Sequence, residues 1–311
     1  MFNTHKFFIL LVFLLSLISC NEIKSEKKEK IISEPEVSEI IEEDYELYKP
    51  GKAIKAVLIL FGGYPEDAKD IEREFKILDI AKNNDIAVIL SNYNQTLWLE
   101  EKNKIQLAKR LQEIIKNNKL PTENIVIGGF SSGGNVSLLI SNYLLGMKHS
   151  NIKPKGVFIV DSPIDLAALY YSSEKNIKRN FSEVSVQESK WIIETLENAF
   201  GNPNNDITNY EENSVFTSRS KYISNLNNLK NTKIRLYTEP DTIWWKENRK
   251  ADYDQLNSYY IKRLETQLKQ SGFDHVALIS TENKGYRANG DRHPHSWTIV
   301  DKIELVQWIL E

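Results

Sequence analysis

The sequence predicts an α/β protein with a mostly parallel sheet of at least six strands, helices on both faces and a helical cap insertion. Three observations lead to this fold class: short apolar runs recur along the chain, segments with helical spacing separate them, and one connection is much longer than the others. Alternation of strands and helices is the pattern of a parallel sheet that is covered on both sides.

Six apolar runs have the length of strands and are nearly continuous in apolar character, as strands covered on both faces are. They lie at residues 54–60, 86–90, 125–127, 156–160, 234–237 and 276–280. The segments between and after them carry apolar residues at helical spacing, which predicts helices that pack on the sheet. These segments are 68–82, 99–118, 136–145, 259–270 and 297–310.

The longest connection runs from Asp161 to Lys233 and shows no clear strand. It holds one predicted helix, at 186–200, which ends at a Gly-Asn-Pro sequence. A connection of this length inside a folded domain usually serves a function. We therefore expect residues 164–231 to form a cap or lid over the ends of the strands.

Residues 1–19 have the features of a signal peptide, in which a basic start precedes an apolar run, and Ser19-Cys20 follow that run. The run is too short to span a bilayer but fits the apolar region of a signal peptide. A small residue followed directly by cysteine resembles the lipobox of bacterial lipoproteins, which implies that Cys20 is the lipid attachment point. A plain signal peptide with a chance cysteine is the alternative.

Residues 20–50 are expected to form an acidic, flexible tether that leads to a domain at 51–311. The stretch 21–46 holds four lysines and ten acidic residues, a net charge of −6, and little that can be buried. This composition favours a solvated segment, with an interaction segment as the second interpretation. The N-terminal features together predict a protein of the cell envelope, anchored by lipid to a bacterial membrane.

The whole chain has 311 residues and a formal charge of −3 without basic blocks, so nothing in it indicates nucleic acid as a partner. Its single cysteine excludes an internal disulfide, a four-thiolate zinc site and a paired-cysteine redox site. No His-Glu-x-x-His motif and no Cys/His cluster is present, so we expect no metal and no organic cofactor. Because Cys20 precedes the domain, covalent chemistry in the domain falls to serine.

Gly129-Phe130-Ser131-Ser132-Gly133 fits the pattern G-x-S-x-G, with a predicted strand before it and a predicted helix after it. The motif requires a strained strand-to-helix turn, with glycines where side chains would clash. This turn exposes the Ser131 hydroxyl and presents the backbone N–H of Ser132 to a developing oxyanion. A Gly/Ser-rich loop without catalytic meaning is the alternative.

The order of these elements resembles the α/β-hydrolase superfamily of serine hydrolases over residues 53–311. In that fold six parallel strands are usual, and the nucleophile follows the third of them, as it does in this sequence. The resemblance implies a second oxyanion donor in the turn after the first of the six strands. That turn reads Phe61-Gly62-Gly63-Tyr64, so the N–H of Gly63 or Tyr64 is the expected donor. Phe61 departs from the His-Gly start that is common there.

The resemblance also implies the chain order serine, acid, histidine, with the acid in the turn after the fifth strand. That turn reads Glu239-Pro240-Asp241, where we expect Asp241 as the acid and Glu239 as the alternate. The family's histidine belongs in the loop before the last helix, which holds both His293 and His295. His295 is nearer the helix and is the expected base, with His293 as the alternate.

These residues predict a serine hydrolase that cleaves a carboxylic ester through this triad and an acyl-enzyme intermediate. Trp98, Trp244 and Trp245 are expected near the carboxyl ends of strands, where they either pack beneath the cap or form a platform for an aryl or carbohydrate ester. Two alternatives stay open: a peptidase or acyltransferase with the same triad, and a binding lipoprotein on a hydrolase scaffold that has lost its activity.

Overall fold

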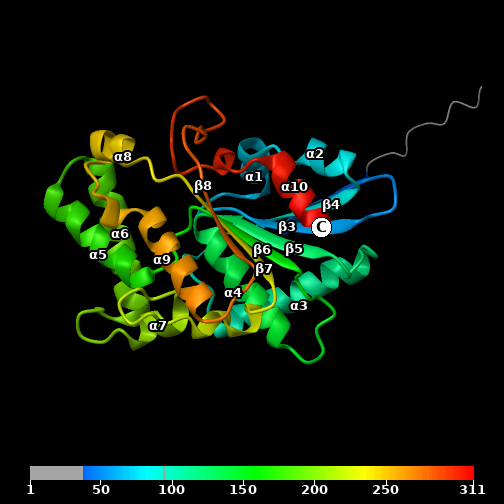
Figure 1. Cartoon of the computed structure of the whole chain (residues 1–311), viewed down its shortest axis with the longest axis horizontal. Helices are drawn as coiled ribbons and strands as arrows, with labels where there is room; N and C mark the ends of the chain where they lie inside the picture. Colours follow the sequence, from blue (N-terminus) through cyan, green and yellow to red (C-terminus); the bar gives the residue numbers. More distant parts are fainter. Residues whose placement is uncertain (1–37, 94–95) are drawn as a thin grey trace, which may run out of the picture. The chain divides into compact units, whose positions relative to one another are not determined.

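A mostly parallel sheet runs through the computed structural model, which describes residues 38–93 and 96–311 (Figure 1). In the described residues the sheet has eight strands in the order β1-β2-β4-β3-β5-β6-β7-β8. The strands are β1 (Ser38–Ile41), β2 (Tyr45–Lys49), β3 (Ala56–Phe61), β4 (Ile86–Ser91), β5 (Ile125–Phe130), β6 (Gly156–Val160), β7 (Lys233–Thr238) and β8 (Val276–Ser280). The six predicted strands are β3 to β8, which pair in parallel and confirm the predicted sheet.

Helices cover both faces of the sheet, which explains why every residue of β3, β4, β5 and β6 is buried. One apolar cluster joins the sheet to α3 (Glu101–Asn117), α4 (Ser132–Gly146) and α9 (Asn257–Gln270). A second cluster joins the opposite face to α1 (Ala68–Phe75), α2 (Leu78–Asn83) and α10 (Lys302–Leu310). The core therefore consists of two layers, one on each side of the strands.

Two predicted helices are interrupted in the structure. The segment 68–82 forms α1 and α2 because Lys76 adopts the left-handed conformation, with φ 50°, and ends the first helix. The segment 297–310 begins with the short 3₁₀ helix η3 (Trp297–Ile299) and continues as α10 only after Asp301. The Asp301 carboxylate accepts the N–H groups of the first turn, as an N-cap residue does.

The long connection between β6 and β7 is helical, as predicted. It contains α5 (Leu166–Arg179), α6 (Glu183–Phe200), α7 (Thr208–Asn213) and the 3₁₀ helix η1 (Ser224–Leu229). Residues of α5, α6 and α7 form an apolar cluster of their own together with Leu97 and Trp98. Figure 1 shows α5 and α6 grouped with α8 (Thr242–Arg249) beside the ends at which β6 and β7 leave the sheet. The insertion therefore stands where a cap was expected.

The predicted tether is too long at its C-terminal end. Residues 38–49, which were placed in the tether, form β1 and β2, and β2 pairs antiparallel with β4. Leu47 is 0% exposed and lies with Tyr45 in the apolar cluster beside α3. The buried Glu46 carboxylate accepts a hydrogen bond of 2.7 Å from the Tyr48 hydroxyl. The sequence analysis missed these strands because they are short and lie within a stretch rich in acidic residues.

Within the described part of the chain, no helix is both long and apolar enough to cross a bilayer. The predicted signal peptide at 1–19, the lipid attachment residue Cys20 and the tether up to residue 37 lie outside the described residues. The lipoprotein interpretation therefore stays a prediction from the sequence.

Candidate active site

Ser131 stands between the end of β5 and the start of α4, in a backbone conformation that non-glycine residues rarely adopt, with φ 53° and ψ −128°. The turn is tight because its glycines touch backbone. A Cβ on Gly129 would lie 2.2 Å from the Gly133 carbonyl oxygen, and a Cβ on Gly133 would lie 2.3 Å from the carbonyl oxygens of Phe61 and Gly62. The sequence motif therefore occupies the strained strand-to-helix turn that it requires.

His295 forms an ion pair or hydrogen bond with Asp161: its Nδ1 lies 2.7 Å from the Asp161 Oδ2. Asp161 directly follows β6, has φ 47°, and is 4% exposed. Its other carboxylate oxygen accepts 2.7 Å from the Thr238 hydroxyl, and its carbonyl accepts 2.8 Å from the Asn257 side chain. These contacts fix the carboxylate and leave the Nε2 of His295 for another partner.

Two contacts of neighbouring residues connect Ser131 with the His295–Asp161 pair. The Ser131 N–H donates 2.9 Å to the carbonyl of Val160, the residue before Asp161. The ring of Phe130, the residue before Ser131, lies 4.5 Å from the His295 ring, measured between centroids. A serine, a histidine and an aspartate thus gather at the carboxyl ends of β5 and β6, the edge at which parallel sheets form their sites.

The structure does not bring the predicted acid, Asp241, to His295. Asp241 caps α8 by accepting 2.9 Å from the Trp244 N–H, and its Oδ2 accepts 2.7 Å from Arg292. Both of its oxygens are therefore occupied elsewhere, and the position assigned to Asp241 is filled by Asp161. Sequence reasoning missed Asp161, although it offered one signal: an aspartate directly after a fully apolar strand.

The alternate acid, Glu239, holds the loop that carries His295. Its carboxylate is buried and accepts hydrogen bonds from the Thr281 hydroxyl (3.0 Å) and from the N–H groups of Lys284 (2.9 Å) and Gly285 (3.2 Å). It also forms an ion pair of 2.5 Å with Arg292. Glu239 thus ties the end of β7 to the segment that leads into the histidine.

The alternate base, His293, has no carboxylate partner among the described residues. Burial, together with the nearby charges of His295, Arg287 and Arg249, lowers its pKa to about 3. Its ring packs against Trp244 and Trp245, at centroid distances of 4.8 Å and 5.7 Å. His293 is therefore a neutral, packed side chain beside the site, and the two tryptophans form part of its surroundings.

We expect His293→Gln to reduce the acid sensitivity of the fold. Folded His293 stays neutral down to a pKa of about 3, whereas the unfolded residue takes up a proton below about pH 6.5. Its stabilising contribution is therefore complete above pH 6.5 and is lost as pH falls, by up to about 3 kcal/mol near pH 4.5. Urea unfolding at pH 7.5 and 4.5 measures the difference, and an equal loss in both proteins would contradict the lowered pKa.

The predicted oxyanion residues surround Ser131. A Cβ on Gly63 would lie 2.8 Å from the Ser131 Cβ, so the backbone of Gly63 contacts the nucleophile directly. In this structure the Tyr64 N–H donates 2.9 Å to the Ser132 hydroxyl, and the Gly63 N–H donates 3.0 Å to the Glu66 carboxylate. The Ser132 N–H belongs to the first residue of α4, where a helix has no carbonyl of its own to offer.

Glu66 is a further residue at the site that the sequence did not indicate. Its Oε2 accepts hydrogen bonds from the Gly63 N–H and from the Trp297 indole N–H, at 3.0 Å and 3.2 Å. Burial raises the pKa of this carboxyl group, against the lowering effect of the two hydrogen bonds. Glu66 thereby fixes the backbone of the oxyanion turn from behind.

The insertion reaches the oxyanion turn and borders a cavity beside the histidine. The ring of Trp191, on α6, stacks on the Tyr64 ring at 5.0 Å. A cavity of about 320 Å³ lies among α5, α6, α8 and the loop with His293 and His295. Trp98 is packed 4.7 Å from Phe200 in the insertion cluster, which favours the packing role for this tryptophan.

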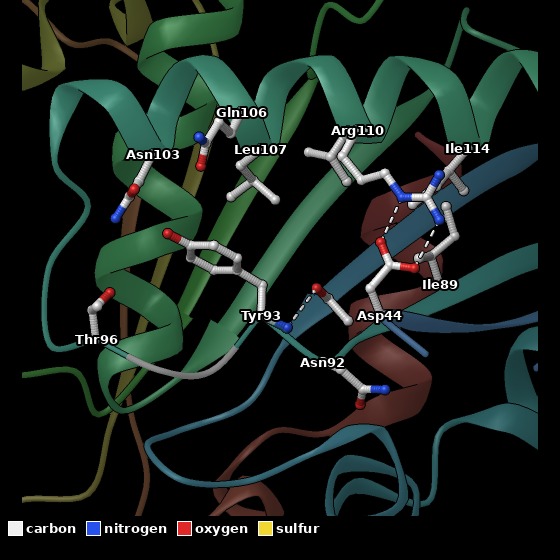
Figure 2. Close-up of a pocket in the computed structure, with 12 residues that line it drawn as sticks. Asp44, Ile89, Asn92, Tyr93, Thr96, Asn103, Gln106, Leu107, Arg110 and Ile114 are labelled. Atoms are coloured by element: carbon white, nitrogen blue, oxygen red, sulfur yellow. Dashed lines mark hydrogen bonds and ion pairs between the residues drawn. The ribbon is translucent and has the colours of Figure 1, made fainter. Parts of the chain in front are cut away.

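A separate cavity of about 450 Å³ lies under α3 beside the end of β4 (Figure 2). Figure 2 shows Asp44 and Arg110 joined across its rim, with an Nη2–Oδ1 distance of 2.7 Å, and the Tyr93 side chain beneath the helix. None of the predicted catalytic residues lines it. In the described ranges, no group of three or more His, Cys, Asp or Glu residues is placed to hold a metal ion.

No protein-family model and no curated protein matches the sequence. Solved structures of esterases are similar over most of both chains. One from Rhizomucor miehei has a TM-score of 0.55 at 15% identity, with 89% of this chain and 85% of that chain covered. An esterase of the bacterial hormone-sensitive lipase family has a TM-score of 0.54 at 13% identity, with 89% and 84% covered. Carboxyl esterase 2 from Tuber melanosporum has a TM-score of 0.53 at 14% identity, with 90% and 87% covered.

These likenesses agree with the parallel strands, the strained serine turn after β5 and the helical insertion after β6. At identities this low they establish the fold. The chain has the α/β-hydrolase fold.

Proposed function

We propose that the protein is a serine hydrolase that cleaves a carboxylic ester, with Ser131 as nucleophile, His295 as base and Asp161 as acid. The observation that carries the proposal is the 2.7 Å contact between the His295 Nδ1 and the Asp161 carboxylate, next to a serine held at φ 53°. A serine hydroxyl is inert without a base, and the base needs an orienting acid. The named activity of the similar esterase structures supports the same reaction class.

In the proposed mechanism, Ser131 attacks the ester carbonyl while the Nε2 of His295 takes its proton. Asp161 holds the N–H of the imidazole on Nδ1 and stabilises the imidazolium that forms. The N–H of Ser132 stabilises the oxyanion, together with the N–H of Gly63 or Tyr64 once it turns from the Glu66 carboxylate or the Ser132 hydroxyl to which it donates in this structure. The protonated histidine then gives its proton to the leaving alcohol, and water activated by the same base releases the acid from the acyl-enzyme.

A fluorophosphonate probe tests this function on the chain from residue 21 onward. The probe should label one site, located in the peptide that contains Ser131, and short aryl esters should be turned over. Ser131→Ala should abolish both labelling and turnover. Ser141→Ala should retain them, because Ser141 is a buried serine within α4, the helix that follows Ser131. If the folded wild-type protein is neither labelled nor active on a broad panel of esters, the chain is a binding protein on a hydrolase scaffold. Faster release of peptides than of esters would favour a peptidase.

We further propose that Cys20 carries a lipid that anchors the protein in the cell envelope. The sequence Ser19-Cys20 after an apolar run is the observation that supports it. Cells that express the full chain and are fed a labelled fatty acid should produce a labelled protein in the membrane fraction. Cys20→Ala should remove the label and release the protein, and unchanged labelling of that variant would disprove the anchor.

A further inference from the structure

The cavity beside His295 is lined mainly by polar side chains, and two of them are arginines. Arg249 and Arg287 line it together with amide and hydroxyl side chains of α5 and of the segment after α8. Its volume of about 320 Å³ is at the small end of ligand pockets. Because His295 lines the same space, a group bound there lies next to the base.

Arg287 is placed close to the reacting residues. Its guanidinium carbon lies 5.7 Å from the centre of the Phe130 ring, and that ring packs against His295 at 4.5 Å. The backbone at Arg287 is fixed: its N–H donates 2.9 Å to the Asp291 carbonyl, and its carbonyl accepts 2.9 Å from the Gly290 N–H. The charge therefore sits at a defined place beside the catalytic pair.

Neither of these arginines forms an ion pair in the described part of the chain. The lysines around them do, since Lys175 pairs with Asp254 and Lys246 pairs with Asp252, each at 2.6 Å. The positive charges of Arg287 and Arg249 contribute, after burial and His295, to the lowered pKa of His293. Among the described residues, neither guanidinium group therefore has a carboxylate bound directly to it, although the charge of Arg287 also acts on Glu66 and opposes the rise in the pKa of that carboxyl group that burial causes.

A third guanidinium group, that of Arg179, binds two residues that line the cavity and has no carboxylate partner among the described residues. Arg179 donates 3.0 Å to the amide oxygen of Asn176 and also donates to the amide oxygen of Gln255. Among the described residues, the cavity lining contains a single carboxylate, that of Glu188. In this part of the chain, Glu188 forms no ion pair within 4 Å with Arg287, Arg249 or Arg179. Guanidinium groups bind carboxylates and phosphates through paired hydrogen bonds. The arginines at this cavity have no such partner among the protein's own described carboxylates.

We propose that the ester substrate of this hydrolase carries an anionic group, a carboxylate, phosphate or sulfate, which Arg287 and Arg249 bind in the cavity beside His295. This inference rests on the proposed function, because it assigns the part of the ester that does not react. The bound anion orients the ester carbonyl toward Ser131, the residue after Phe130, whose ring packs against His295. Binding energy from a remote anion then favours turnover of the correct ester.

Matched pairs of aryl esters test the inference. One pair places the charge on the acyl part, p-nitrophenyl hydrogen glutarate against p-nitrophenyl pentanoate. The other places it on the leaving group, 4-acetoxybenzoate, 4-acetoxyphenyl phosphate and 4-acetoxyphenyl sulfate against phenyl acetate. After correction for spontaneous hydrolysis, kcat/KM should favour an anionic ester by about ten- to a hundredfold, and added salt should reduce that preference. The ester with the highest preference identifies the anionic group and shows whether it lies on the acyl part or on the leaving group.

Variants separate this cavity from general surface charge. Arg287→Met and Arg249→Met should each bring the preference for the anionic ester down by about tenfold. Arg263→Met is the matched control, because Arg263 is exposed, lacks a carboxylate partner among the described residues and lies outside the cavity lining. Its preference should equal that of the wild type. Circular dichroism checks that every variant is folded.

Failure of this inference is distinct from failure of the function. If the probe labels Ser131 and neutral esters are turned over, but no anionic ester is preferred, the inference is overturned and the hydrolase stands. An equal fall in preference in all three arginine variants would also overturn it. If neither probe nor ester reacts with the folded protein, the proposed function fails and the inference fails with it.

Discussion

Asp161→Asn is expected to lower kcat for ester hydrolysis by roughly a thousand- to ten-thousandfold. The Asp161 carboxylate lies 2.7 Å from the His295 Nδ1 and is buried, so it holds the proton on that nitrogen and stabilises the imidazolium. An asparagine amide has nearly the same shape, but with its N–H₂ toward the ring it selects the tautomer whose Nε2 cannot accept the Ser131 proton. Stability should change far less than kcat, because the remaining side-chain oxygen can still accept from Thr238.

Asp241→Asn is the matched control, since it makes the same change in the carboxylate that the sequence had favoured. Its oxygens bind Arg292 and the Trp244 N–H, so we expect kcat to fall by no more than about tenfold. Steady-state kinetics of both variants on one aryl ester measures the ratio. A larger loss in Asp241→Asn than in Asp161→Asn would return the acid to the turn after β7.

The sequence predicted an acid at this edge of the sheet but placed it after β7, with Asp241 preferred over Glu239, and it missed Asp161. Asp161 follows β6, while Glu239 and Asp241 follow β7, and these two strands are neighbours in the sheet. The carboxylate that reaches His295 depends on the path of the loop from 281 to 296, which no local pattern describes. That loop is held by Arg292 and Glu239, whose pairing joins residues 53 apart in the chain.

Other parts of the site follow from local requirements and were therefore predictable. The turn at Ser131 needs glycines on both sides, because a Cβ on Gly129 or Gly133 would meet backbone at 2.2 Å or 2.3 Å. Such a requirement for glycine can be recognised in the sequence itself. The contact of Glu66 with the Gly63 N–H, in contrast, connects a charged side chain to a backbone group. The residues around Glu66 have the composition of an ordinary exposed turn, so the sequence does not indicate this contact.

The same distinction applies to the fold. Strands β3 to β8 could be predicted because, in most of them, burial on both faces leaves nearly continuous apolar runs. Strands β1 and β2 each contain a glutamate and are joined by an acidic turn, and they were assigned to the tether. Helix α8 was missed because it buries no residue, so its sequence has no apolar stripe.

Glu239→Ala is expected to lower the free energy of unfolding by about 3–5 kcal/mol. The substitution leaves the Arg292 guanidinium without its buried partner and removes the acceptor for the Lys284 and Gly285 N–H groups and for the Thr281 hydroxyl. Each donor left without a partner in a buried position costs free energy in its own right. Urea unfolding monitored by circular dichroism measures the loss.

The loss should have a catalytic component that stability alone does not explain. Glu239 holds the segment that carries His295, so releasing it moves the base while Ser131 stays fixed between β5 and α4. Under conditions where circular dichroism shows the variant fully folded, kcat should still fall by about tenfold or more. KM should rise as well, because the released loop also carries Arg287, two residues after Gly285.

Two matched variants make this result specific. Glu239→Gln keeps one acceptor oxygen, which serves the N–H of Lys284 or that of Gly285 but not both, and it loses the charge that Arg292 binds, so its loss of stability should be intermediate. Asp241→Ala removes the more exposed partner of Arg292 and the cap of α8, with an expected loss of about 1–2 kcal/mol. If Asp241→Ala lost as much stability as Glu239→Ala, the histidine loop would be anchored by the ion pair of Arg292 with the more exposed Asp241. Glu239 is buried and its carboxylate accepts from four donors, so we expect the pair of Arg292 with Glu239 to be the anchor.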